Sequence, residues 1–235
     1  MRGVFVTATD TGVGKTVLTA AVCAALRGRG VRVAAYKPVV TGLDAPEPGV
    51  PPDHVLLAAC TGQEPGAVTP HTFGPAVSPH LAAAAAPLDP AALEAAARAA
   101  APSNGVLVAE GVGGLLVPLA PAGYDVRALA RALGLPVVIA ARPGLGTINH
   151  TLLTLEAARA AGLDVRGVVL TPWPRAPSAM EQSNAETIAA LGGVPVSLLP
   201  HADALTPDAL AAAGSRLPLG DWVGPARAEP GRCVL

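Results

Sequence analysis

The sequence predicts an α/β protein with three layers, in which helices cover both faces of a mostly parallel β-sheet. Short apolar runs, of the length of buried strands, alternate with helical patterns along the chain. The first of these runs passes through a glycine-rich turn directly into a helix. No repeat or linker interrupts this succession, so residues 1–223 are expected to form one domain and residues 224–235 a disordered tail.

The first strand and the turn after it, residues 4–16, have the pattern of a phosphate-binding loop. They read VFVTATDTGVGKT, and a helical pattern follows over residues 17–26. Glycines let backbone N–H groups surround a phosphate, a lysine reaches the β- and γ-phosphates, and a hydroxyl ligates Mg²⁺. Thr9 stands where the strict motif has glycine. A glycine-rich turn with a chance lysine is the alternative, but strand, loop and helix together predict a domain of the P-loop NTPase type.

The second strand is expected over residues 31–36 and ends at Lys37. Lys15 and Lys37 are the only lysines among the 16 basic residues of the chain. Where nearly all cations are arginine, a remaining lysine indicates a need for a compact ammonium group, although chance placement is the alternative. A loop rich in glycine, proline and acidic residues follows over 40–52. It leaves the carboxyl end of the strand, where open α/β sheets bind their ligands.

Two carboxylates lie close to this expected site. Asp53 begins a helix over residues 53–60, and it is either the cap of that helix or a carboxylate near bound Mg²⁺. Glu110 follows a clean apolar strand over residues 105–109. It is either a solvated loop residue or a second carboxylate that approaches Mg²⁺ from the end of its strand.

The rest of the chain continues the alternation. Residues 61–90 are rich in proline and are expected to form loops. A glycine-rich turn precedes the helix that begins at Thr147, and we expect Thr147 and Asn149 to cap this helix and to create a second anion site. Helices are expected at 90–101, 124–133, 147–161, 178–191 and 206–213, and strands at 136–141, 165–170 and 194–199.

Composition excludes several classes of protein. The net charge of -1 and the absence of a basic run argue against a nucleic-acid partner. The mean hydropathy is +0.47, but no uninterrupted apolar stretch reaches the roughly 20 residues that span a bilayer, so a soluble protein without a membrane partner is expected. No export signal is visible, which predicts a cytoplasmic location. The three cysteines, at 23, 60 and 233, are too widely spaced for a disulfide framework or a zinc site.

Five blocks of this sequence resemble those of dethiobiotin synthetase, the penultimate enzyme of biotin synthesis. The first block, residues 7–16, alone indicates only the wider P-loop superfamily. Tyr36-Lys37-Pro38-Val39 and Gly146-Thr147-Ile148-Asn149-His150 are far more specific. The blocks follow the family's order over about the first 155 residues, at 7–16, 36–39, 78–80, 110–114 and 146–150.

The resemblance implies an ATP-dependent ring closure. In this family 7,8-diaminopelargonic acid takes up CO₂ as a carbamate, and the carbamate oxygen attacks the γ-phosphate. The second amine then closes the cyclic urea as phosphate leaves. Because carbamate and γ-phosphate are both anionic, the reaction requires cations aimed at the developing charge. The family acts as a homodimer with Mg²⁺ and ATP.

The resemblance also implies a role for individual residues. The implied catalytic residues are Lys37, Lys15 and Thr11. The implied Mg²⁺ ligands are Thr16, Asp53 and Glu110. Nucleotide binding is implied for Asp10, Gly12, Val13, Gly14, Lys15, Thr16, Thr171, Pro172 and Pro200. Substrate binding is implied for Thr11, Lys37, Thr41, Gly113, Thr147 and Asn149, the last two from the partner subunit of the dimer.

Two departures from the family pattern have physical consequences. The family usually has glycine at position 8, so Ala8 is expected to fit only with a negative φ. Many members have Asn-Asp, an amide that reads adenine, where this chain has Thr171-Pro172. Proline has no N–H, and threonine lacks the paired donor and acceptor of an amide. The departure predicts a relaxed or altered preference for the nucleobase.

Two other members of the superfamily are the alternatives. Partitioning and septum-positioning ATPases carry a signature lysine five residues before the loop lysine, where this chain has Asp10. Ligases of the cobyrinate-amidating type need ammonia from a glutaminase domain with a nucleophilic cysteine. The chain offers no second domain of that kind.

Overall fold

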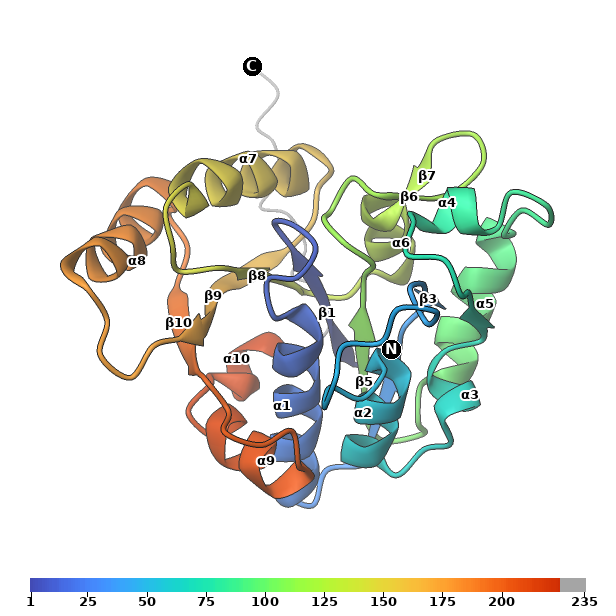
Figure 1. The fold of residues 1–235 in the computed structure, drawn as a ribbon, viewed down its shortest axis with the longest axis horizontal. Coiled ribbons are helices and arrows are strands. Elements are labelled where there is room, and N and C mark those ends of the chain that lie inside the picture. Colours follow the sequence, from blue (N-terminus) through green and yellow to red (C-terminus); the bar gives the residue numbers. More distant parts are fainter. Residues whose placement is uncertain (225–235) are drawn as a thin grey trace.

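A six-stranded parallel sheet forms the centre of the computed structural model, which describes residues 1–224 (Figure 1). All neighbouring strands of this sheet pair in parallel, which confirms the predicted architecture. The strand order is β10-β9-β8-β1-β5-β2. The bounds are β1 (Gly3–Ala8), β2 (Val33–Tyr36), β5 (Val106–Glu110), β8 (Val137–Ala141), β9 (Val165–Trp173) and β10 (Val196–Pro200).

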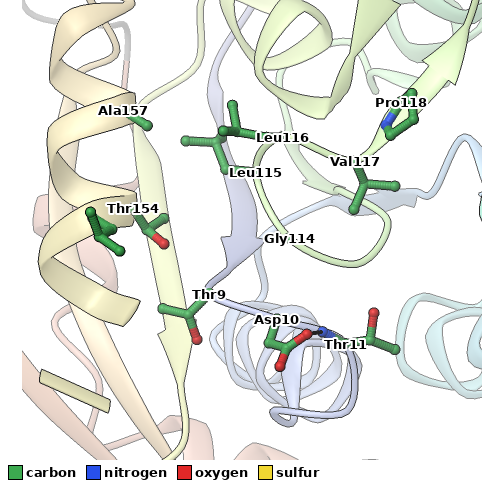
Figure 2. A pocket seen from close by; sticks show the side chains of 11 residues that line it. Thr9, Asp10, Thr11, Gly114, Leu115, Leu116, Val117, Pro118, Thr154 and Ala157 are labelled. Atoms are coloured by element: carbon green, nitrogen blue, oxygen red, sulfur yellow. Dashed lines mark hydrogen bonds between the residues drawn. The ribbon is translucent and has the colours of Figure 1, made fainter. Parts of the chain in front are cut away.

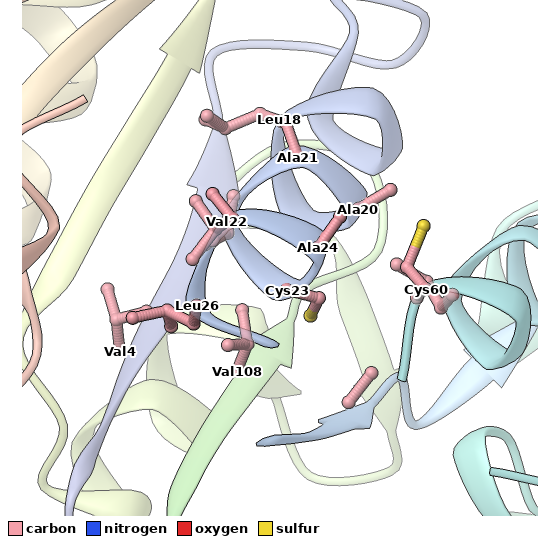
Figure 3. Close-up of a cluster of buried hydrophobic side chains, with 14 of the residues drawn as sticks. Val4, Leu18, Ala20, Ala21, Val22, Cys23, Ala24, Leu26, Cys60 and Val108 are labelled. Atoms are coloured by element: carbon pink, nitrogen blue, oxygen red, sulfur yellow. The ribbon is translucent and has the colours of Figure 1, made fainter. Parts of the chain in front are cut away.

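Helices cover both faces of the sheet because successive side chains of each strand point to opposite sides. Val4 and Val6 of β1 pack in one core cluster, part of which Figure 3 shows, and Phe5 packs in the other. The first face carries α1 (Lys15–Gly28), α2 (Asp53–Thr61), α9 (Pro207–Gly214) and α10 (Leu219–Trp222). The second carries α5 (Pro90–Ala100), α6 (Val126–Leu133), α7 (Thr147–Ala160) and α8 (Ala179–Gly192).

The expected loop over residues 61–90 contains short regular elements. Residues 39–40 (β3) pair with residues 71–72 (β4), and two four-residue helices lie nearby. The bounds are β3 (Val39–Val40), α3 (Pro65–Val68), β4 (His71–Thr72) and α4 (Pro79–Ala82). The predicted helix over 124–133 begins two residues late, because Asp125 accepts a hydrogen bond from the backbone N–H of Ala128 and caps α6. Tyr124–Asp125 instead forms β7, which pairs with β6 (Pro118–Ala120).

Strand β9 is longer than predicted. The expected end was residue 170, but the strand continues through a cis Thr171–Pro172 bond to Trp173. Its pairing with β8 stops at Leu170, and only β10 accompanies the extension, through Trp173 and Pro200. The missing N–H of Pro172 therefore interrupts no ladder with β8.

The end of the described chain differs by one residue from expectation. Gly224, predicted to begin the tail, forms an antiparallel bridge with Gly3. Residues 225–235 of the expected tail, and with them Cys233, lie outside the described residues. Among residues 1–224, no helix combines the length and the apolar character needed to cross a bilayer.

Candidate active site

The carboxyl ends of β1, β5 and β2 are neighbours in the sheet, and the loops that leave them meet around one cavity of about 310 Å³. We call it the loop cavity. It lies beside the phosphate loop, residues 9–14, which joins β1 to α1. The predicted site residues that line it are Thr11, Gly12, Gly14, Lys15, Thr16, Lys37, Thr41, Asp53 and Gly113.

The phosphate loop has the backbone that an anion site requires. Gly12 and Gly14 have φ values of 73° and 86°, which L-residues with side chains rarely adopt. Gly14 is the N-cap of α1 and no side chain caps this helix. Its first N–H groups and the positive end of its dipole are therefore available to a phosphate. Ala8 was expected to fit only with a negative φ. It lies within β1 and is not among the residues with positive φ, so this expectation is confirmed.

A buried ion-pair network lies at the floor of the loop cavity. The Lys37 ammonium donates to Glu110 Oε1 at 2.7 Å and also to Asp53 Oδ2. Thr16 Oγ1 donates to the same Glu110 oxygen at 2.8 Å. Glu110 is fully buried and Lys37 is 4% exposed. The side chain of Asp53 is 40% exposed. Buried charges persist only when they are paired, so Lys37 and Glu110 require each other.

The network shifts the proton affinities of its members. Burial lowers the pKa of Lys37, but the charges of Glu110 and Asp53 and their hydrogen bonds outweigh burial and raise it above the ordinary value. For Lys15, burial and the nearby charge of Lys37 together lower the pKa to about 8. Burial raises the pKa of Asp53, but the Lys37 ammonium more than offsets this, and the net shift is downward. Lys37 thus remains an ammonium at neutral pH.

The residues implied as metal ligands fit a hard cation such as Mg²⁺. Glu110 Oε2 is buried and has no hydrogen-bond partner in the described structure. Thr16 and Asp53 add a hydroxyl and a second carboxylate beside it. Hydroxyl and carboxylate oxygens are the ligands that Mg²⁺ takes in proteins. The unsatisfied oxygen of Glu110 is the observation that best matches a cation at this point.

A second cavity, of about 290 Å³, adjoins the first and is called the proline cavity here. Both are lined by Gly14, Val17, Val50 and Leu205. Thr171, Pro172 and Pro200, for which the resemblance implies nucleotide binding, line it together with His201. A Cβ atom on Gly14 would lie 3.1 Å from Thr171 Cγ2, so Thr171 leaves little room for a side chain at position 14 of the phosphate loop.

A third cavity, of about 430 Å³, lies between the phosphate loop and α7 (Figure 2). We call it the α7 groove. Asp10, predicted to bind nucleotide, faces this groove instead of the loop cavity. Its carboxylate accepts from the Thr11 N–H at 2.7 Å and from Arg142 Nη2 at 2.9 Å. Leu153 and Leu116, both more than half exposed, form part of its walls.

Several predicted residues lie elsewhere or act differently. Thr147 and Asn149 do not line the loop cavity, and their expected capping of α7 is wrong. Gly146 is the cap, and the buried Thr147 hydroxyl lies 3.4 Å from that of Thr151. Asp53 is not a cap either, because Pro52 holds that position in α2. The side chain of Val13 is buried, so only its backbone can face a nucleotide.

Sequence reasoning missed Arg142 and His201. Arg142 directly follows β8 in the same way that Lys37 follows β2 and Glu110 ends β5. The rule that polar residues at strand ends line the site would have found it. His201 directly follows β10 and lines the proline cavity, so the same rule would have found it.

Comparisons of the sequence with known proteins agree with this geometry. A family model described as an AAA domain matches residues 2–209. The chain is 44% identical over 204 residues to ATP-dependent dethiobiotin synthetase BioD of Anaeromyxobacter dehalogenans (strain 2CP-C), covering 85% of this chain and 90% of that protein. It is 40% identical over 223 residues to the protein of the same name from Mycobacterium avium (strain 104), covering 95% and 98%.

Solved structures support the fold alone. The septum site-determining protein MinD complexed with Mg-ADP from Pyrococcus horikoshii OT3 is similar with a TM-score of 0.51 and 17% identity, over 91% of this chain and 94% of that one. A ParA family ATPase from Chlorobium tepidum TLS has a TM-score of 0.52 and 13% identity, over 92% and 90%. These values place the chain in the P-loop NTPase fold class that the sequence predicted.

The contact between Asp53 and Lys37 predicts a pH dependence of stability. The lowered pKa of Asp53 means that its ionised form stabilises the fold above the unfolded-state pKa of about 3.9, and that this contribution is lost as the pH falls through the folded-state value. In urea unfolding with EDTA, the free energy of unfolding of the wild type should exceed that of Asp53→Asn near pH 6. The difference should shrink as the pH falls from about 5 to about 3.

Glu156, an exposed carboxylate on α7, provides the control. The free energy of unfolding of Glu156→Gln, measured over the same pH range, shows the effect of losing one surface carboxylate. A difference for Asp53→Asn that does not change with pH, or that follows the Glu156→Gln curve, would contradict the assigned contact.

Proposed function

The chain belongs to the family of ATP-dependent dethiobiotin synthetases, and from this premise we propose how its site performs the reaction. The enzyme is an ATP-dependent ligase that forms C–N bonds, with 7,8-diaminopelargonic acid and CO₂ as substrates and dethiobiotin, ADP and phosphate as products. The observation that best supports the mechanism is the buried Lys37 ammonium beside the phosphate loop. It provides a positive charge where two anions must meet.

In this proposal Lys15 and Lys37 stabilise negative charge on different groups. Lys15, at the start of α1, contacts the β- and γ-phosphates together with the N–H groups of the phosphate loop. Lys37 contacts the carbamate that forms on one amine of the substrate. The carbamate oxygen attacks the γ-phosphorus and ADP leaves, which gives a carbamic-phosphoric anhydride. The second amine attacks its carbonyl carbon, the ring closes and phosphate leaves. Each lysine stabilises negative charge that grows as the phosphoryl group moves.

Mg²⁺ is the proposed metal, and Thr16, Asp53 and Glu110 would hold it. When bound, it neutralises charge on the phosphates of the nucleotide. The fit rests on the oxygen ligands of these residues and on the unpartnered Glu110 Oε2. ATP as co-substrate is consistent with the cytoplasmic location that the sequence predicts.

The substrate lies between the loop cavity and the α7 groove in this proposal. Thr11 lines both of them, and Thr41 and Gly113 line the first. These residues contact the diamine or carbamate end of the substrate. The apolar walls of the groove, with Leu115 and Val117, suit the hydrocarbon chain.

A homodimer completes the proposed substrate site. Three leucines on or near the α7 groove have exposed side chains: Leu116 is 55% exposed, Leu145 88% and Leu153 56%. Exposed apolar side chains that lie near one another are typical of a surface that contacts another protein. A second copy that covers these side chains would bring the N-terminus of its α7 to the groove. The far carboxylate of the substrate would then contact Thr147 and Asn149 of the partner subunit.

The switch-ATPase alternative has less support. Its signature lysine is replaced by Asp10, which is paired with Arg142 and bound to the Thr11 N–H. The structures of such ATPases resemble this chain at only 13–17% identity, which supports a shared fold and no more. The proposal includes no nucleic-acid or membrane partner.

The first prediction is the reaction itself. Purified protein with Mg²⁺, ATP, bicarbonate and 7,8-diaminopelargonic acid should form dethiobiotin and release one phosphate per dethiobiotin, measured together by mass spectrometry and phosphate detection. Phosphate release that does not depend on the diamine would favour the switch-ATPase alternative.

The same assay with CTP and GTP tests the base preference. The wall of the proline cavity contains two prolines, which lack N–H groups, one buried threonine and several apolar side chains, with Glu47 and His201 as its other polar residues. A largely apolar site discriminates weakly between similar ligands, so we expect at least one other triphosphate to reach a kcat/KM within about tenfold of ATP. A preference for ATP of about 10³-fold or more would contradict this expectation.

Lys37→Gln should slow the chemical step without weakening nucleotide binding. Because its charge matters mainly as the phosphoryl group moves, kcat should fall by a factor of about 10³ while the Kd for the nucleotide stays within a few-fold of the wild type. Lys15→Gln should instead weaken nucleotide binding, measured by calorimetry. Loss of nucleotide binding in a folded Lys37→Gln protein would show that the two roles are wrongly assigned.

Leu153→Glu tests the dimer. A carboxylate on the exposed face of α7 should shift the protein from dimer to monomer in sedimentation equilibrium, because a charge buried in an apolar interface is costly. Glu156→Gln on the same helix is the control. A wild-type protein that sediments as a monomer would contradict the proposal.

A further inference from the structure

Lys37 lies between the two carboxylates that the proposed function assigns to the metal. Its ammonium contacts Glu110 Oε1 at 2.7 Å and Asp53 Oδ2 as well. The third proposed ligand, Thr16 Oγ1, donates to the same Glu110 oxygen at 2.8 Å. Lysine and metal ligands therefore converge on one point in the described structure.

This point suits a single cation at a time. An ammonium group and Mg²⁺ are both bound by carboxylate oxygens, at about 2.7–2.9 Å for N⁺–H···O⁻ and about 2.0–2.1 Å for Mg–O. Lys37 now contacts one oxygen of each carboxylate, Glu110 Oε1 and Asp53 Oδ2, and leaves Glu110 Oε2 without a partner. A metal held by the same two carboxylates would lie directly beside the ammonium. Since two adjacent cations would repel each other, metal binding and the present position of Lys37 exclude each other.

The same contacts explain why a cation must be present at all times. Glu110 is fully buried, and an uncompensated buried carboxylate costs several kcal/mol. Without a divalent ion, Lys37 supplies the compensating charge. When the ion supplies it, the ammonium is released. Its four-carbon side chain can then turn into the loop cavity, which Lys37 itself lines together with Thr11 and Gly113.

We propose that Lys37 occupies the metal position in the nucleotide-free enzyme, and that arrival of the metal displaces its ammonium toward the substrate side of the loop cavity. The inference rests on the proposed function for the identity of the ligands. As a consequence, the Lys37 ammonium can contact the carbamate only after the metal has bound. Metal binding and carbamate binding are thereby coupled.

Binding of Mn²⁺ without nucleotide tests the competition. Free Mn²⁺ is measured by electron paramagnetic resonance in the presence of the wild type, Lys37→Met and Lys15→Met. Lys15→Met is the control, because it also removes one positive charge from the lining of the loop cavity. Among the described residues, Lys15 makes no hydrogen bond to Asp53 or Glu110. Lys37→Met should bind Mn²⁺ about tenfold or more tightly than the wild type, and Lys15→Met should gain less than about threefold.

The two-lysine composition allows a second measurement on the wild-type chain. Protein labelled with ¹³C at lysine Cε should give two side-chain signals, and the spectrum of Lys15→Met, which keeps Lys37, identifies the one from Lys37. Titration with Mg²⁺ alone should shift the Lys37 signal strongly and the Lys15 signal weakly. This readout needs no variant that folds without its buried cation.

Three results would overturn the inference. They are equal Mn²⁺ affinity in Lys37→Met and the wild type, an equal gain in Lys15→Met, or a Lys37 signal that does not move when Mg²⁺ is bound. Absence of Mn²⁺ binding to every variant would overturn the metal ligands as well. The dethiobiotin assay on the wild type decides separately whether the proposed reaction is correct, so the two failures are distinguishable.

Discussion

A buried ammonium between two carboxylates is the interaction on which the site depends. Lys37 follows β2, Glu110 ends β5 and Asp53 begins α2, so three segments far apart in the sequence are held by one charge. Lys37 and Glu110 would each be costly to bury alone. The strand order β1-β5-β2 is what places the phosphate loop against this pair, because the carboxyl ends of neighbouring parallel strands lie side by side.

The fold was largely predictable because its main signals are local. Apolar runs located the strands of the central sheet, and Gly14-Lys15-Thr16 located the start of α1. The short pairs β3–β4 and β6–β7 were not predictable, since each strand has two or three residues and depends on contacts with distant segments. The extension of β9 was missed because Pro172 normally ends a strand, and only the pairing with β10 shows why it does not.

The site was predictable to the extent that its residues follow strands. Lys37 and Glu110 were found from their positions at strand ends, and the structure brings them within hydrogen-bond distance. Asp10 was assigned to nucleotide binding through the family resemblance, but its carboxylate pairs with Arg142, which lies 132 positions away in the chain. Thr147 was expected to cap α7, and Gly146 takes that place. Side-chain direction is set by neighbours in space, which a single sequence does not reveal.

The position of Thr171 beside Gly14 limits the length of a ligand that could occupy both the loop cavity and the proline cavity. Gly14 of the phosphate loop lines both the loop cavity and the proline cavity, and Thr171 of β9 lines the second one beside it. Both belong to rigid elements, the start of α1 and an extended strand. The span between the two cavities is therefore a fixed length of the protein. If the nucleotide fills both cavities, as the proposed function has it, the distance from its base to its phosphates must match this length.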